Sequence, residues 1–174
     1  MSDIDSDKWL EAMKSQMNSM GSNQVWTLVD PTKGVRPVGC KWVYKHRLGA
    51  DGEVTAFKAR LVAKGYTQRP GVDFGDLFAS SMAKSIWILL AIAAWYDYEI
   101  WQMDVKMAFL NGFVEEEIFM DQPEGFTAVG EEQKVCRLQR SIYGLRQASQ
   151  SWNTRFDKVI RGYDFIKNDY DPCI

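Results

Sequence analysis

Histidine is almost absent from this 174-residue sequence, and cysteine is sparse. His46 is the only histidine, and Cys40, Cys136 and Cys173 form no C-x-x-C pair. Zinc sites need several such ligands at close spacing, and disulfide scaffolds need a dense, even set of cysteines. We therefore expect neither. A Ser-His-Asp or Cys-His catalytic site would depend on His46, which we expect on a strand surface without a catalytic role.

Long apolar runs are also absent. The longest, at residues 86–95, is too short to span a bilayer, and the N-terminus lacks the basic-then-apolar pattern of a signal peptide. The hydrophobic content of 46% and aromatic content of 13% are sufficient for one core. These features predict a soluble, intracellular protein that has no membrane partner.

Although the formal net charge is only -2, the acidic and basic residues are concentrated in separate segments of the chain. Residues 41–70 hold seven basic and two acidic residues, residues 97–133 hold one basic and ten acidic residues, and residues 134–161 hold seven basic and one acidic residue. Two basic segments around an acidic one suit a site that grips phosphates on both sides of a metal-binding carboxylate. The alternative is that all three are solvated faces, which is the commoner origin of charge clusters.

The periodicity of apolar residues predicts interleaved helices and strands, hence an α+β fold. Helices are predicted at 6–20, 84–96 and 147–160, and strands at 26–29, 40–47, 54–63, 100–105, 118–120 and 135–138. The turn at 49–52 contains Asp51-Gly52 and predicts a hairpin. The helix at 84–96 is apolar on nearly every side, so we expect it to be buried.

The predicted strand at 100–105 brings Asp104 to its end, on the face that it shares with Ile100 and Gln102. A carboxylate placed there can hold a hard divalent cation. Phe109 follows on the next turn. Taken alone, such an aspartate is more often a turn or cap residue, and Phe109 is more often part of a core.

Six blocks, in order along nearly the whole chain, resemble the reverse transcriptase of copia-type long-terminal-repeat retrotransposons. They are KWVYK at 41–45, KARLVAKGYTQ at 58–68, GVDF at 71–74, the segment at 100–112, MDQPEGF at 120–126, and YGLRQA at 143–148 followed by Ser151 and Trp152. One block alone would be modest evidence, but six ordered blocks are specific.

The resemblance implies an RNA-directed DNA polymerase, a nucleotidyltransferase that extends a primer on an RNA or DNA template with deoxynucleoside triphosphates. The family uses two Mg²⁺ ions for this transfer. By this resemblance Asp104 is the first metal-binding aspartate, and the carbonyl of Val105 helps to hold the second ion. Phe109 matches the aromatic residue that excludes a ribonucleotide 2'-hydroxyl.

The resemblance also implies nucleotide-binding roles outside the metal site. Lys58 and Arg60 match cations that contact the triphosphate, and Arg60 is the stronger candidate because a guanidinium fork matches phosphate oxygens. Gly144 and Gln147 match the segment that contacts nucleotide and template. Without the resemblance, Lys58 and Arg60 would be read as surface charges of the hairpin.

By the same resemblance the chain is a partial polymerase right hand, in which a fingers hairpin is joined to an incomplete palm sheet with packed helices. The expected parts are an N-terminal helix at about 1–25, a fingers-like part at about 26–80 and a palm-like part at about 81–174. The other partner is then the rest of a Pol polyprotein, and the location is a cytoplasmic retrotransposon particle.

The family's Tyr-x-Asp-Asp motif is absent, and no Asp-Asp pair occurs anywhere in the sequence. We therefore expect a fragment, ending before that motif, that is inactive alone. Trp87 stands where the family carries arginine, and Met107 where a small polar residue is common. Two alternatives remain open: a nucleic-acid-binding fragment without catalysis, and a functionless transposon relic.

Overall fold

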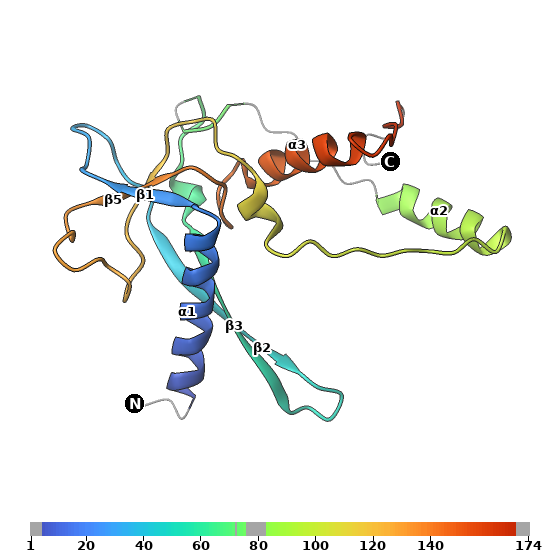
Figure 1. Ribbon diagram of the computed structural model, residues 1–174, viewed down its shortest axis with the longest axis horizontal. Helices are drawn as coiled ribbons and strands as arrows, with labels where there is room; N and C mark the ends of the chain where they lie inside the picture. The colour runs from blue at the N-terminus through green and yellow to red at the C-terminus, as the bar shows by residue number, and fades with distance from the viewer. Residues whose placement is uncertain (1–4, 72, 76–82, 170–174) are drawn as a thin grey trace.

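The computed structural model describes residues 5–71, 73–75 and 83–169, and it contains helices and two antiparallel sheets (Figure 1). This confirms the α+β class. Helix α1 (Ser6–Ser22) begins where the sequence predicts and buries Gln16 and Met20. In the described part of the chain, none of the helices has the length and apolar content needed to cross a membrane.

The larger sheet has three antiparallel strands in the order β1-β5-β4. These are β1 (Trp26–Val29), β4 (Phe119–Met120) and β5 (Val135–Leu138), which match the predicted strands to within one residue. Trp26 lies opposite Leu138, and Met120 lies opposite Cys136. Because Met120, Cys136 and Leu138 are buried, this sheet supplies much of the core.

The second sheet is the predicted hairpin of β2 (Cys40–Leu48) and β3 (Val54–Ala63). At the turn, Gly49 N donates to Glu53 O over 2.8 Å, and Gly52 has a φ of 83° that suits glycine. The hairpin extends from the body of the molecule with α1 alongside it (Figure 1). It is held there by Trp9 of α1, whose ring contacts Phe57 at 4.7 Å.

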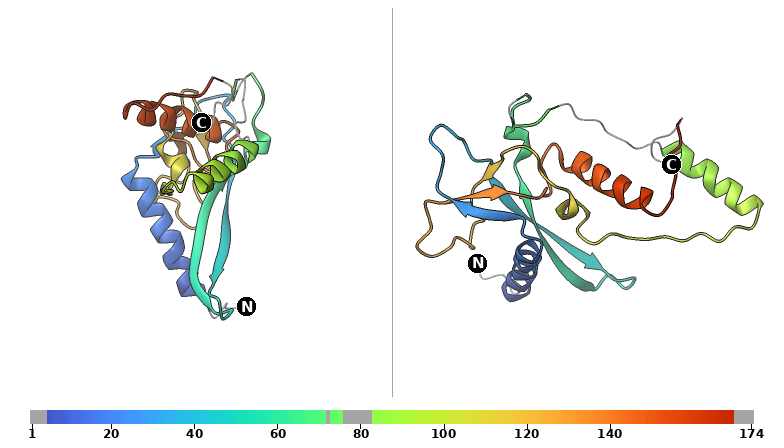
Figure 2. Two further views of the ribbon diagram at one scale, coloured as in Figure 1. Left: turned by 90° about the vertical axis from the view of Figure 1, so that its right-hand side faces the viewer. Right: turned by 45° about the horizontal axis from the view of Figure 1, so that its top comes forward.

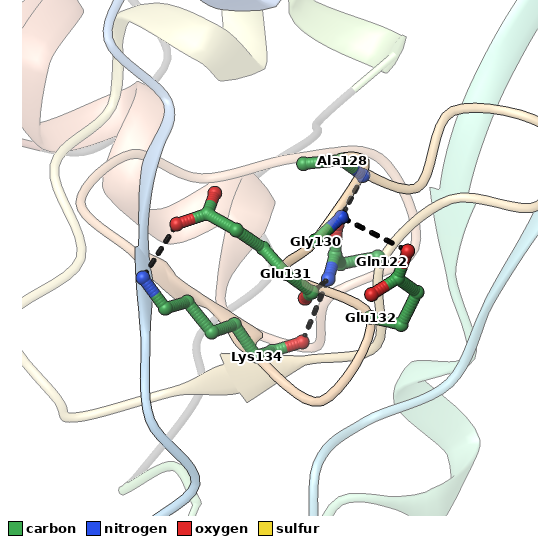
Figure 3. Close-up of polar contacts among 6 residues, drawn as sticks. All are labelled: Gln122, Ala128, Gly130, Glu131, Glu132 and Lys134. Atoms are coloured by element: carbon green, nitrogen blue, oxygen red, sulfur yellow. Dashed lines mark hydrogen bonds and ion pairs between the residues drawn. The ribbon is translucent and has the colours of Figure 1, made fainter.

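A polar cluster closes the loop between β4 and β5 (Figure 3). Gln122 Nε2 donates to the carbonyls of Glu131 and Lys134 over 2.7 and 2.9 Å, while Gln122 Oε1 accepts from Ala128 N over 3.0 Å. The loop in turn supports the base of the hairpin, because Trp42 Nε1 donates to the carbonyl of Glu124. The MDQPEGF block thus has a structural role in which one side chain satisfies three backbone groups.

Replacing Gln122 with alanine is expected to lower the free energy of unfolding by about 1–3 kcal/mol, because partly buried backbone groups lose their partners. Urea unfolding followed by circular dichroism measures this difference. Gln133→Ala is the matched control, since Gln133 is exposed in the same loop; its effect should stay within about 0.5 kcal/mol. Equal effects at the two positions would contradict a closing role for Gln122.

Helix α2 (Ala83–Trp95) forms as predicted, but the expectation that it is buried is wrong. The side chains of Trp87 and Trp95 are 72% and 83% exposed. The helix lies toward the end of the molecule that is distant from both sheets (Figures 1 and 2). An apolar composition shows that burial would stabilise a helix, but it does not show that the described part of this chain supplies the surface that buries it.

The predicted strand at 100–105 is also wrong, because these residues are assigned to no strand and are exposed. Trp101 is 86% exposed and Met103 is 84% exposed. Alternation identifies residues that would suit a sheet, whereas a strand also needs a neighbour for its backbone hydrogen bonds. No neighbouring strand accompanies this segment within the described ranges.

Two further helical elements follow. The short 3-10 turn η2 (Ala108–Asn111) begins after Met107, which has a left-handed φ of 53°, and it buries Leu110. Helix α3 (Ala148–Arg161) matches its predicted extent to within one residue. Two of its apolar side chains, Phe156 and Val159, are 42% and 40% exposed.

Candidate functional site

The register of the hairpin gathers its cations on one face. Lys45 lies directly opposite Lys58, and Val43 lies opposite Arg60. Because alternate residues of a strand share a face, five cations point to the same side of the sheet. This basic face consists of Lys41, Lys45, Arg47, Lys58 and Arg60.

The opposite face of the hairpin is the one that α1 covers. Tyr44, His46 and Phe57 lie there, and the ring of Trp9 contacts all three at 4.7 to 5.1 Å. His46 is thus an exposed strand residue packed beside Trp9, in agreement with its prediction as a surface residue. Since α1 covers the opposite face, the basic face is the open face of the hairpin. Within the described ranges, none of its five cations forms an ion pair.

Arg60 and Phe109, which are distant in sequence, both contact Tyr143. The Arg60 guanidinium carbon lies 5.4 Å from the centre of the Tyr143 ring, a cation–π geometry. The Phe109 and Tyr143 rings meet at 4.8 Å with their planes 66° apart. The sequence prediction named Arg60 and Phe109 as site residues but missed Tyr143, whose only signal was its membership of the YGLRQA block.

Backbone contacts hold Tyr143 and Gly144 against β3. Ala63 N donates to Tyr143 O over 2.8 Å. Gly144 has a φ of 91°, and a Cβ atom on it would lie 2.2 Å from the Ala63 carbonyl oxygen. A Cβ on Gly65 would lie 2.0 Å from the Gly144 carbonyl oxygen. Gly144 therefore allows a close backbone approach to the chain's own strand β3; its contact with a nucleotide stays a prediction.

Gln147 is only 3% exposed, and its amide is bonded within the protein. Its Nε2 donates to Asp73 O over 3.2 Å and to Glu116 Oε2 over 3.4 Å, and its Oε1 accepts from Gln68 Nε2 over 3.2 Å. Gln68, also buried, accepts from Arg146 N over 2.9 Å. This arrangement connects the end of the hairpin to the YGLRQA block. Sequence reasoning missed Gln68, and nothing beyond its place in a block marked it.

The described residues do not fit a two-metal site. Asp104 and Val105 lie in the exposed segment before η2. In the described part of the chain, no three His, Cys, Asp or Glu side chains cluster closely enough to hold an ion. Two divalent ions need several carboxylate ligands around them. The roles of Asp104 and Val105 therefore stay predictions that require ligands from elsewhere.

The two described cysteines are unsuited to nucleophilic chemistry. Burial of the thiol is the main cause that raises the pKa of Cys40 to about 11, and the negative charge of Asp121 is the second cause. Burial is also the main cause that raises the pKa of Cys136 to about 12, and the charge of Cys40 is the second cause. Because the thiolate is the reactive form, both thiols stay protonated and inert at neutral pH.

The profile of the family described as "Reverse transcriptase (RNA-dependent DNA polymerase)" matches residues 23–174. The Pol polyprotein of transposon TNT 1-94 from Nicotiana tabacum is 43% identical over 95% of this chain. Those of transposons RE2 and RE1 from Arabidopsis thaliana are 39% and 36% identical over 97% of it. No solved structure matches.

The chain spans 12% of the length of each of these three relatives. Within that span, the blocks that build the basic face and the Arg60–Tyr143–Phe109 contacts fall inside the region covered by the family profile. The chain therefore belongs to the reverse transcriptase family of copia-type retrotransposon Pol polyproteins.

Proposed function

We propose that this chain is part of the polymerase domain of a retrotransposon reverse transcriptase, with its basic face turned toward nucleic acid and nucleotide. The observation that carries the proposal is the hairpin register, which places five cations on the face opposite α1. Clustered, unpaired cations form the electrostatic footprint of a phosphate-binding surface.

The proposed roles follow from position. Lys58 and Arg60 contact the triphosphate of a deoxynucleotide, since both lie on the basic face. Phe109 contacts the sugar, because Tyr143 connects its ring to Arg60. The buried amide of Gln147 positions the YGLRQA block, and Gly144 keeps that block against β3.

We assign Asp104 and Val105 to a Mg²⁺ site of the complete polymerase. Mg²⁺ supplies charge neutralisation at the phosphates when it is bound there. We propose that the chain is inactive by itself, because binding two divalent ions takes carboxylates in addition to Asp104. Its proposed parts are an N-terminal helix at about 1–25, a fingers-like part at about 26–80 and an incomplete palm-like part at about 81–174 of a polymerase right hand. The proposed partners are a template with primer, deoxynucleotides and the rest of the Pol polyprotein, in a cytoplasmic particle.

Primer extension on an RNA template tests this proposal. The chain alone is expected to incorporate no nucleotide in the presence of Mg²⁺. The chain joined to the segment that follows the matching region of the tobacco relative is expected to incorporate deoxynucleotides, and Asp104→Asn in that longer form is expected to abolish incorporation. A longer form that folds but remains inactive would contradict the proposal and favour the relic interpretation.

Nucleic-acid binding without catalysis is a second candidate. The observation that favours it is the same basic face, which needs no metal site to bind phosphates. Binding of a primer–template to the unaltered chain, with an affinity that falls steeply as salt rises, separates this candidate from the relic interpretation.

A further inference from the structure

We propose that Tyr143 is a positioning residue that fixes Arg60 of the hairpin relative to Phe109 of η2. Its ring receives the Arg60 guanidinium at 5.4 Å and the Phe109 ring at 4.8 Å. Arg60 and Phe109 are distant in the sequence, so the local backbone does not fix their side chains relative to each other. The Tyr143 ring contacts both groups, and it thereby fixes the position of the Arg60 guanidinium relative to the Phe109 ring.

The ring, and not its hydroxyl, makes both contacts. A guanidinium is attracted to the electron-rich face of an aromatic ring, and tilted aromatic pairs gain from the same charge distribution. Phenylalanine at position 143 would keep both interactions. Leucine would fill much of the volume but would offer no aromatic ring to either partner.

The ring also has a firm anchor. Its own carbonyl accepts from Ala63 N over 2.8 Å, and the next residue, Gly144, packs against the Ala63 carbonyl. Since these contacts belong to the backbone, substitution of the side chain leaves the docking of the loop in place. A change at Tyr143 therefore acts on the positions of Arg60 and Phe109 more than on the fold.

The consequence for nucleotide binding rests on the proposed function. An arginine side chain has many rotamers, and holding it in one of them before the ligand arrives lowers the entropy cost of binding. With Tyr143 in place, a cation for the triphosphate and a ring for the sugar are held together. Loss of the ring is expected to weaken deoxynucleotide binding by about two- to fivefold, the scale of one cation–π contact.

Nuclear magnetic resonance of the full chain tests the positioning directly. Ring-current shifts of the Arg60 side chain should persist in Tyr143→Phe and disappear in Tyr143→Leu, and the Phe109 ring signals should move in the leucine variant alone. Tyr66→Leu is the matched control, since Tyr66 is 70% exposed and should leave both signals unchanged. Unaltered Arg60 and Phe109 signals in folded Tyr143→Leu would overturn the inference.

Titration of the same proteins with dTTP and with the matching ribonucleotide, followed by the same signals, tests the nucleotide-binding consequence. Tyr143→Leu should weaken dTTP binding and reduce the preference for the deoxy form, whereas Tyr143→Phe should retain both. If the unaltered chain binds neither nucleotide, the proposed function loses support, while the shifts without nucleotide still decide the role of Tyr143.

Discussion

Replacement of Gly144 with alanine is expected to lower the free energy of unfolding by about 2–5 kcal/mol, the combined scale of left-handed backbone strain and an overlap in a packed contact. Gly144 has a φ of 91°, and the added Cβ would lie 2.2 Å from the Ala63 carbonyl oxygen and 2.7 Å from Val62 Cγ1. The nearest atom is backbone, so it cannot move aside as a flexible side chain could. Urea unfolding of both proteins measures the difference.

Gly125→Ala is the matched control for Gly144→Ala. Gly125 has a φ of 79°, but a Cβ there would meet nothing within 4 Å. The control therefore reports the cost of the left-handed backbone alone, about 1–2 kcal/mol. Similar losses at both positions would show that the contact between the YGLRQA block and β3 does not require glycine.

Local patterns predicted the elements whose partners lie nearby in the sequence. The hairpin is the clearest case, because its two alternating segments are joined by a turn that contains Asp51-Gly52, and its pairing needs no distant residue. Helix α1 and helix α3 were likewise predicted from the periodicity of their apolar residues. In these regions sequence and structure agree to within about two residues.

The structure departs from prediction where burial or pairing depends on distant surfaces. The segment at 84–96 has the composition of a core helix, and the segment at 100–105 has the alternation of a strand. Yet both are exposed among the described residues. Composition and alternation show which kind of surface would suit a segment. Whether the folded chain brings such a surface next to the segment depends on its tertiary structure.

The candidate site shows the same division. Lys58 and Arg60 could be placed on one face from alternation alone, and the register then added Lys45 opposite Lys58. Tyr143 and Gln68 could not be identified in this way. Their roles arise from contacts between the hairpin region and a loop much later in the sequence. Gln68 and its partner Gln147, for example, are 79 residues apart. Only the fold reveals such pairs.

Lys45 lies directly opposite Lys58 in the hairpin, and like charges in that arrangement destabilise a sheet. Reversing both charges, with Lys45→Glu and Lys58→Glu together, is expected to weaken binding of a primer–template by at least about tenfold at low salt, because two phosphate contacts are lost and repulsion is added. Fluorescence anisotropy across a series of salt concentrations measures this effect. The slope of log affinity against log salt should become shallower by about two.

Lys14→Glu together with Lys33→Glu is the matched control, since it changes the net charge equally at exposed positions outside the basic face. This control is expected to retain most of the affinity and nearly all of the salt slope. Equal weakening by both double variants would mean that overall charge governs binding, and it would remove the basic face as the phosphate-binding surface. A loss confined to the hairpin variant would instead locate the phosphates on the face of the sheet opposite α1, where Arg60 and Tyr143 also meet.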